Sequence, residues 1–168
     1  MRLDTLQDLL IDQLQDLWSA KRQIHDALPG MAHAAYSSDL KEVLEEYMRT
    51  TKDQIARIEE VLNKLGVGHD GKRCEGMEGL IREGRNYVQR DGDPEVKDTA
   101  LITAARKIEH YELTGYGAAR SYARELGYND IADLLQETLD EEGESEKQLS
   151  SLARGGFYST GRDREQPF

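Results

Sequence analysis

Apolar residues return every three or four positions along four long stretches of the chain, which is the spacing of one helix face. In the first stretch the stripe consists of Leu6, Leu10, Leu14, Leu17, Ile24 and Leu28. Asp4 stands where a helix cap is expected, and Pro29-Gly30 stands where this helix ends or kinks. Strand-like alternation of apolar and polar residues is absent, so the pattern predicts an all-α protein.

Residues typical of helix ends mark the other three helices. The second begins at Ser37 or Ser38 and ends at Gly66, the third begins at Pro94 and ends at Gly127, and the fourth begins near Asn129. A polar, glycine-rich loop and one short helix separate the second and third stretches, and we expect this short helix to cross one end of the bundle. Four helices of about 25 to 33 residues predict a four-helix bundle with one short extra helix. The bundle is expected over residues 1–153, with a flexible C-terminal tail over 154–168.

Polar residues interrupt all four stripes near their middles. They are Lys21 in the first stretch, Tyr47, Thr50, Thr51 and Gln54 in the second, Glu109 and Glu112 in the third, and Glu142 and Glu146 in the fourth. Isolated buried carboxylates are costly, so several that converge in a core require a compensating cation, either a metal ion or a lysine. Inward carboxylates on facing helices hold the ions of di-iron and di-manganese bundles. The alternative is that some of these glutamates face solvent.

Composition and charge argue against several classes of function. The 168 residues carry 22 positive and 33 negative charges, a net charge of −11, which disfavours binding to nucleic acid or to an anionic membrane. No apolar stretch is long enough to span a membrane and the acidic N-terminus does not resemble a secretion signal, so we expect a cytoplasmic protein. The single cysteine, Cys74, cannot form an internal disulfide. His110 is turned about 100° from Glu109, so it is expected beside the polar layer and not in it.

Several segments resemble the YciE/YciF family of bacterial ferritin-like stress proteins in order and spacing. They are LWSAKRQIHDALPGMA, KRCEGMEGLIREG, DTALITAARKIEHYELTGYGAARSYARELG and LLQETLDEEGESEKQLSSLA. The resemblance extends to about Ala153. It implies a ferritin-like four-helix bundle, similar to rubrerythrin and other di-iron carboxylate proteins, that forms a homodimer and is associated with stress responses.

The chain departs from this family pattern in its first half. Lys21 stands where the family has a glutamate, Tyr47 where it has a histidine, and Thr50 where it has a second glutamate. In the second half Glu109, Glu112 and Glu142 match the family, and Glu146 stands where an aspartate is usual. The resemblance therefore implies that the metal ligands of the last two long helices are kept and those of the first two are lost.

Two hypotheses follow. In the first, the core holds at most one iron or manganese ion, with its ligands among Glu109, Glu112, Glu142 and Glu146. In the second, the protein is a metal-free structural or interaction module whose core network of Lys21, Tyr47, Thr50 and Gln54 replaces the missing ligands. Whether the protein is an enzyme stays open. The tail contains Phe157, Tyr158 and Phe168 and is expected to be dispensable for folding, although it can dock a partner.

Overall fold

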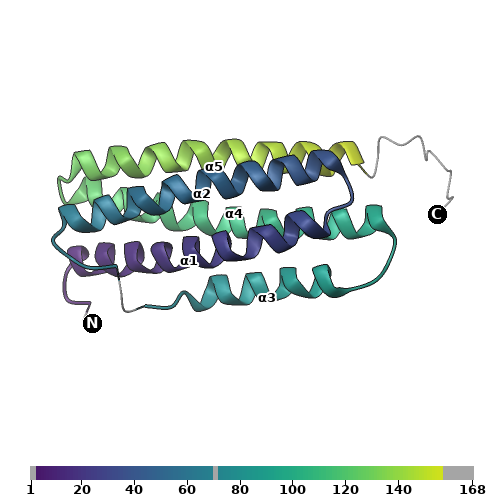
Figure 1. Ribbon diagram of the computed structural model, residues 1–168. Helices are drawn as coiled ribbons and strands as arrows, with labels where there is room; N and C mark the ends of the chain where they lie inside the picture. The colour runs from purple at the N-terminus through teal and green to yellow at the C-terminus, as the bar shows by residue number, and fades with distance from the viewer. Residues whose placement is uncertain (1–2, 70–71, 157–168) are drawn as a thin grey trace, which may run out of the picture.

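The computed structural model describes residues 3–69 and 72–156 and is all-α over that part of the chain (Figure 1). Its helices are α1 (Leu6–Ala34), α2 (Ser38–Lys64), α3 (Glu75–Gln89), α4 (Pro94–Glu125) and α5 (Asn129–Gly156). The four long helices lie side by side as a bundle, and α3 is the short extra helix. The predicted fold class is therefore confirmed. No helix within the described residues has an apolar segment of the length and hydropathy that a membrane span needs.

The order of the helices is that of a ferritin-like bundle. Short turns join α1 to α2 and α4 to α5, so each of these pairs is antiparallel (Figure 1). The connection from α2 to α4 runs back along the bundle, so α2 and α4 are parallel. A four-helix bundle with one long crossover has this topology.

Helix α3 lies along the side of the bundle, against α1 and α4, and not across its end as expected (Figure 1). Its N-cap is the buried Cys74, whose backbone N–H donates to Ser19 Oγ at 2.9 Å. The Cys74 thiol also contacts Asp16 on α1 and Tyr111 on α4, at 3.1 and 3.0 Å. These contacts fix the start of α3 to both helices, and burial raises the pKa of the thiol.

Two helix ends differ from the expectation. Thr5 caps α1 in place of Asp4, through a capping box in which Thr5 and Asp8 bond each other's backbone N–H. Pro29 lies inside α1, and the helix continues past it to Ala34. Pro29 is exposed, so water can solvate the backbone carbonyl that lacks a donor because proline has no N–H. Helix α5 continues through Gly156, and residues 157–168 of the predicted tail lie outside the described residues.

The core consists of two apolar clusters, one toward each end of the bundle. One contains Ile24, Leu28, Leu44, Leu101, Ile108 and Leu149 among others, and the second contains Leu10, Leu14, Leu17, Ile58, Leu62 and Leu135 among others. Gly115 brings α4 close to α1, because a Cβ at this position would lie 2.8 Å from Leu17 Cδ2. The helix middles, where the stripes are polar, lie between the two clusters.

The turn between α1 and α2 depends on one carboxylate from α4. The two oxygens of Asp98, which is 7% exposed, each accept a 2.7 Å hydrogen bond, one from Tyr36 N–H and one from Ser37 N–H. Ser37 is the N-cap of α2, so this contact determines where that helix begins. Hydrogen bonds to a charged partner are worth more than neutral ones.

We predict that Asp98→Ala lowers the free energy of unfolding by about 2 to 4 kcal/mol, because two backbone donors lose a charged acceptor. Urea denaturation at pH 7 measures this loss. The control is Asp53→Ala, at an exposed site on α2, for which we expect a change within about 0.5 kcal/mol. Equal effects of the two substitutions would show that Asp98 does not stabilise the turn between α1 and α2.

Candidate metal site in the bundle core

A buried polar layer crosses the bundle between the two apolar clusters. Its six members are each at most 2% exposed, and all four bundle helices contribute at least one. They are Lys21 from α1, Tyr47 and Gln54 from α2, Glu109 and Glu112 from α4, and Glu142 from α5. The structure thus brings together six of the residues that the interrupted stripes single out.

The ammonium group of Lys21 lies at the centre of this layer. Its Nζ is 2.6 Å from one oxygen of each of three side chains, Glu112, Glu142 and Gln54. An ammonium has three N–H donors, so each donor has an oxygen within reach. The ring centroids of Tyr47 and Tyr116 lie 5.8 and 5.6 Å from Nζ, close enough for cation–π attraction.

The surroundings of Lys21 keep it charged. Burial alone would favour the neutral amine, but the negative charges of Glu112 and Glu142 outweigh it and raise the pKa of Lys21 above its ordinary value. The layer therefore contains a permanent positive charge at every pH near neutrality. A divalent cation cannot approach the position of Nζ without strong repulsion.

The three carboxyl groups around this cation differ in protonation. Burial, with a smaller effect from Glu142, raises the pKa of Glu109 to about 12 and that of Glu112 to about 8. Burial also opposes ionisation of Glu142, but Lys21 and a hydrogen bond from Glu109 outweigh it and lower the pKa of Glu142. At neutral pH, therefore, Glu109 is protonated and donates to the Glu142 carboxylate. Tyr47 OH donates to Glu112 Oε2 at 2.6 Å.

One corner of the layer is short of donors. Both oxygens of Glu109 and Oε2 of Glu142 are buried, and apart from the proton that Glu109 itself holds, no N–H or hydroxyl donor of the described residues bonds to them. One oxygen each from Glu109, Glu112 and Glu142 lie within 4.8 Å of one another. A proton held between the carboxyl groups, a buried water or a bound cation would satisfy these oxygens.

The charges of these residues suit one divalent ion and not two. Three ionised carboxylates and the Lys21 ammonium sum to −2, which one divalent cation neutralises, whereas two such cations would leave a buried charge of +2. The ligands on offer are hard carboxylate oxygens, which suit manganese or ferrous iron. Glu109, Glu112 and Glu142 would hold the ion, and the Lys21 ammonium, 2.6 Å from both Glu112 and Glu142, would repel a second one.

Two charged residues at the edge of the layer, Glu141 and Arg57, orient Gln54. Its amide Nε2 donates to Glu141 Oε2 at 2.9 Å, so its oxygen is directed at Lys21. Arg57 holds Glu141 with two hydrogen bonds of 2.8 and 3.0 Å and also donates to Thr138. Sequence reasoning missed Arg57, whose only signal is its position one turn after Gln54 on the same helix face.

Thr50 and Glu146 do not reach the layer. Thr50 is half-buried and donates to the carbonyl of Glu46 on its own helix. The buried threonine is Thr51, although its hydroxyl donates to the Tyr47 carbonyl and not to the carboxylates. Glu146 is 18% exposed and accepts hydrogen bonds from Arg106 and Ser150. It therefore lies outside the group of carboxylates that could share one ion.

His110 is also outside the layer, as its position on the helix predicts. It is 63% exposed, and its Nε2 lies 3.4 Å from Glu146 Oε1. This contact lies at the surface of α4 and α5, so His110 takes no part in the central cluster.

The chain was compared with known protein families, proteins and structures. A family model described as a domain of unknown function, DUF892, matches residues 5–160. Protein YciF of Escherichia coli strain K12 is 37% identical over 154 residues, which cover 91% of this chain and 93% of YciF.

Solved structures agree with this match. The crystal structure of the E. coli stress protein YciF superimposes with a TM-score of 0.88 at 36% identity, over 91% of this chain and 97% of that one. YcfI from Rhodopseudomonas palustris, provisionally described as a structural protein, gives a TM-score of 0.86 at 36% identity over 89% of this chain and 95% of that one. The protein therefore belongs to the DUF892 family, together with the YciF stress protein.

Proposed function

We propose that this protein is a ferritin-like stress protein whose core binds one divalent cation, iron or manganese, through Glu109, Glu112 and Glu142. The observation that carries the proposal is the corner at Glu109, where buried carboxyl oxygens converge and no donor of the described residues other than the Glu109 carboxyl itself reaches them. A divalent cation there would bind these oxygens. It would also cancel the charge of −2 that remains when Lys21 neutralises one of the three ionised carboxylates. The stress association comes from YciF, whose description names it a stress protein.

Lys21 is the residue that limits this site to one ion. In bundles with two ions, bridging carboxylates hold the pair of metals on which their oxidative chemistry depends. Here two of the three carboxylates already bond an ammonium at 2.6 Å. A single ion would supply a Lewis acid or a one-metal redox centre, and the residues around it would orient it, exclude water and supply a fixed positive charge.

A metal-free role is the second candidate, and the contacts of Lys21 favour it. Three hydrogen-bonding distances of 2.6 Å and a proton on Glu109 already compensate much of the buried charge. The protein would then act as a structural or interaction module. In both cases we infer, from the family, a homodimer in the cytoplasm.

Metal stoichiometry separates the two candidates. Protein freed of metal with a chelator and titrated with Mn²⁺ in a calorimeter is expected to bind one ion per chain at pH 7.5. Glu109→Gln should lose this binding, because the amide keeps the shape but removes a ligand charge, whereas Glu146→Gln, the matched control, should keep it. Two ions per chain would contradict the role of Lys21, and no binding to the wild type would leave the metal-free function.

The pH dependence of stability tests the protonation of Glu109. Its pKa in the folded protein is about 12 and its value in the unfolded chain is near 4.5, so the folded state holds the extra proton between these values. This stabilisation is complete below pH 4.5 and is lost as pH rises toward 12. We therefore expect the chelator-treated wild type to become less stable between pH 5 and pH 8.

Glu109→Gln cannot lose this proton. Its free energy of unfolding should fall less steeply between pH 5 and 8, by up to about 1.4 kcal/mol per pH unit, the value for one proton. Urea denaturation at four pH values gives both slopes. Parallel curves for wild type and variant would mean that Glu109 is ionised in the folded protein.

Removal of the Lys21 charge should be costly without metal. Lys21→Met keeps the length of the side chain but leaves Glu142 without its cation, so we expect a loss of about 3 to 5 kcal/mol at pH 7 in the presence of chelator. Mn²⁺ should restore more stability to this variant than to the wild type, because the competing positive charge is gone. Lys147→Met, at a side chain 75% exposed, is the control and should change stability little. An equally small effect of Lys21→Met would show that the Lys21 ammonium does not compensate the buried carboxylates.

A further inference from the structure

A groove separate from the polar layer runs between α1 and α3. It consists of two adjoining hollows of about 230 and 130 Å³, which share Asp26, Ile81 and Arg85 in their walls. One hollow is rich in charged side chains and the other is mostly apolar. A groove that changes from charged to apolar along its length suits a ligand with the same division.

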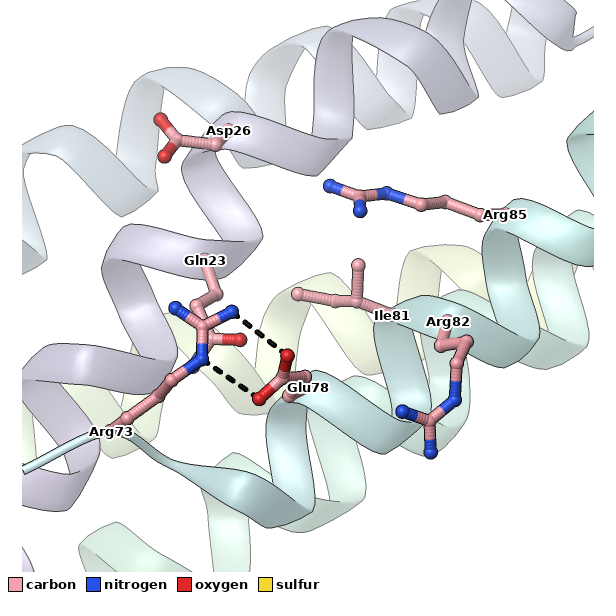
Figure 2. Close-up of a pocket in the computed structure, with 7 residues that line it drawn as sticks. All are labelled: Gln23, Asp26, Arg73, Glu78, Ile81, Arg82 and Arg85. Carbon is pink, nitrogen blue, oxygen red and sulfur yellow. Dashed lines mark hydrogen bonds and ion pairs between the residues drawn. The ribbon is translucent and has the colours of Figure 1, made fainter.

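Of the three arginines that line the charged hollow, one is both unpaired within the described residues and directed across the groove. Arg73 is held by Glu78 through two hydrogen bonds of 2.8 and 3.0 Å. Arg85 has no hydrogen bond or ion pair to any residue of the described chain, and Figure 2 shows its side chain extended from α3 toward α1, beside Ile81. The guanidinium of Arg82 points away from Arg85 in the same view.

The lining is positive on a chain that is strongly negative. The residues that line the charged hollow include three arginines, Asp26 and Glu78, a formal charge of +1, whereas the whole chain carries −11. This local inversion favours an anion there. Asp26 is 71% exposed on the opposite wall and would repel a dianion more than a monoanion. The hollow thus suits a carboxylate better than a doubly charged phosphate.

The second hollow provides apolar surface next to Arg85. Its walls include Met31 from α1, Val88 from α3 and Ile108 from α4. Gly30 lies in its rim, and a Cβ at Gly30 would meet no atom within 4 Å, so the hollow is open at this point. Burial of a short alkyl chain on this surface would add favourable hydrophobic energy.

We propose that this groove binds a small aliphatic monocarboxylate, with its head group on the Arg85 guanidinium and its alkyl chain along Ile81 and Met31. Arg85 supplies a two-pronged N–H surface that matches the two oxygens of a carboxylate. The small volumes of the two hollows limit the ligand to a short chain.

Titration with octanoate, followed by NMR of methyl groups, tests this proposal on the full chain. We expect saturable shifts of the Ile81 and Met31 methyl signals with a dissociation constant of about 1 mM, as ligands of this size commonly show. Octanol and octylammonium, which lack the negative head group, should bind at least tenfold more weakly.

Two variants locate the site. Arg85→Glu should weaken octanoate binding at least tenfold, whereas Arg124→Glu, the same charge change at the exposed end of α4, should change it less than twofold. Gly30→Leu places a large side chain at the rim of the apolar hollow, so it should weaken octanoate binding and leave the helical circular dichroism unchanged.

Three results would overturn the proposal. Octanol that binds as well as octanoate would show that Arg85 does not recognise the head group. Equal weakening by Arg85→Glu and Arg124→Glu would show non-specific attraction. Absence of octanoate binding, together with dissociation of a dimer by Arg85→Glu in light scattering, would assign this face to contact between two copies of the chain.

Discussion

The compensation of buried carboxylates by one ammonium group is the constraint on which the middle of this bundle depends. Glu109, Glu112 and Glu142 lie in a core that is closed to water, where separate negative charges cannot persist. Lys21 forms ion pairs with Glu112 and Glu142, and Glu109 holds a proton. The apolar clusters on either side supply most of the packing, and they also remove the water that would otherwise solvate these charges.

The same compensation explains how the family fold is adapted here. The second half of the bundle supplies the buried carboxyl groups of Glu109, Glu112 and Glu142, and the first half supplies Lys21, Tyr47 and Gln54 to the same layer. A lysine from α1 can replace a metal ion because it provides charge and three donors at the same position. An ammonium group cannot change its oxidation state, so Lys21 supplies charge to the core but no redox chemistry.

Sequence periodicity was sufficient for the helices and for most of the polar layer. Lys21, Glu112 and Glu142 continue their stripes in phase, so helical spacing alone aims them inward. It could not decide between Thr50 and Thr51, which lie on either side of the stripe and differ by one 100° step. It also missed the position of α3 and the contact of Asp98 with the α1–α2 turn, because both depend on segments that are distant in sequence.

The central claim is that Lys21 takes the place of a second cation. A crystal structure of the protein soaked in Mn²⁺, with an anomalous difference map calculated at the manganese edge, tests it directly. The account predicts a single peak among Glu109, Glu112 and Glu142, with the Lys21 ammonium still in contact with Glu112 and Glu142. Two peaks in the layer, with Lys21 displaced from both carboxylates, would contradict it.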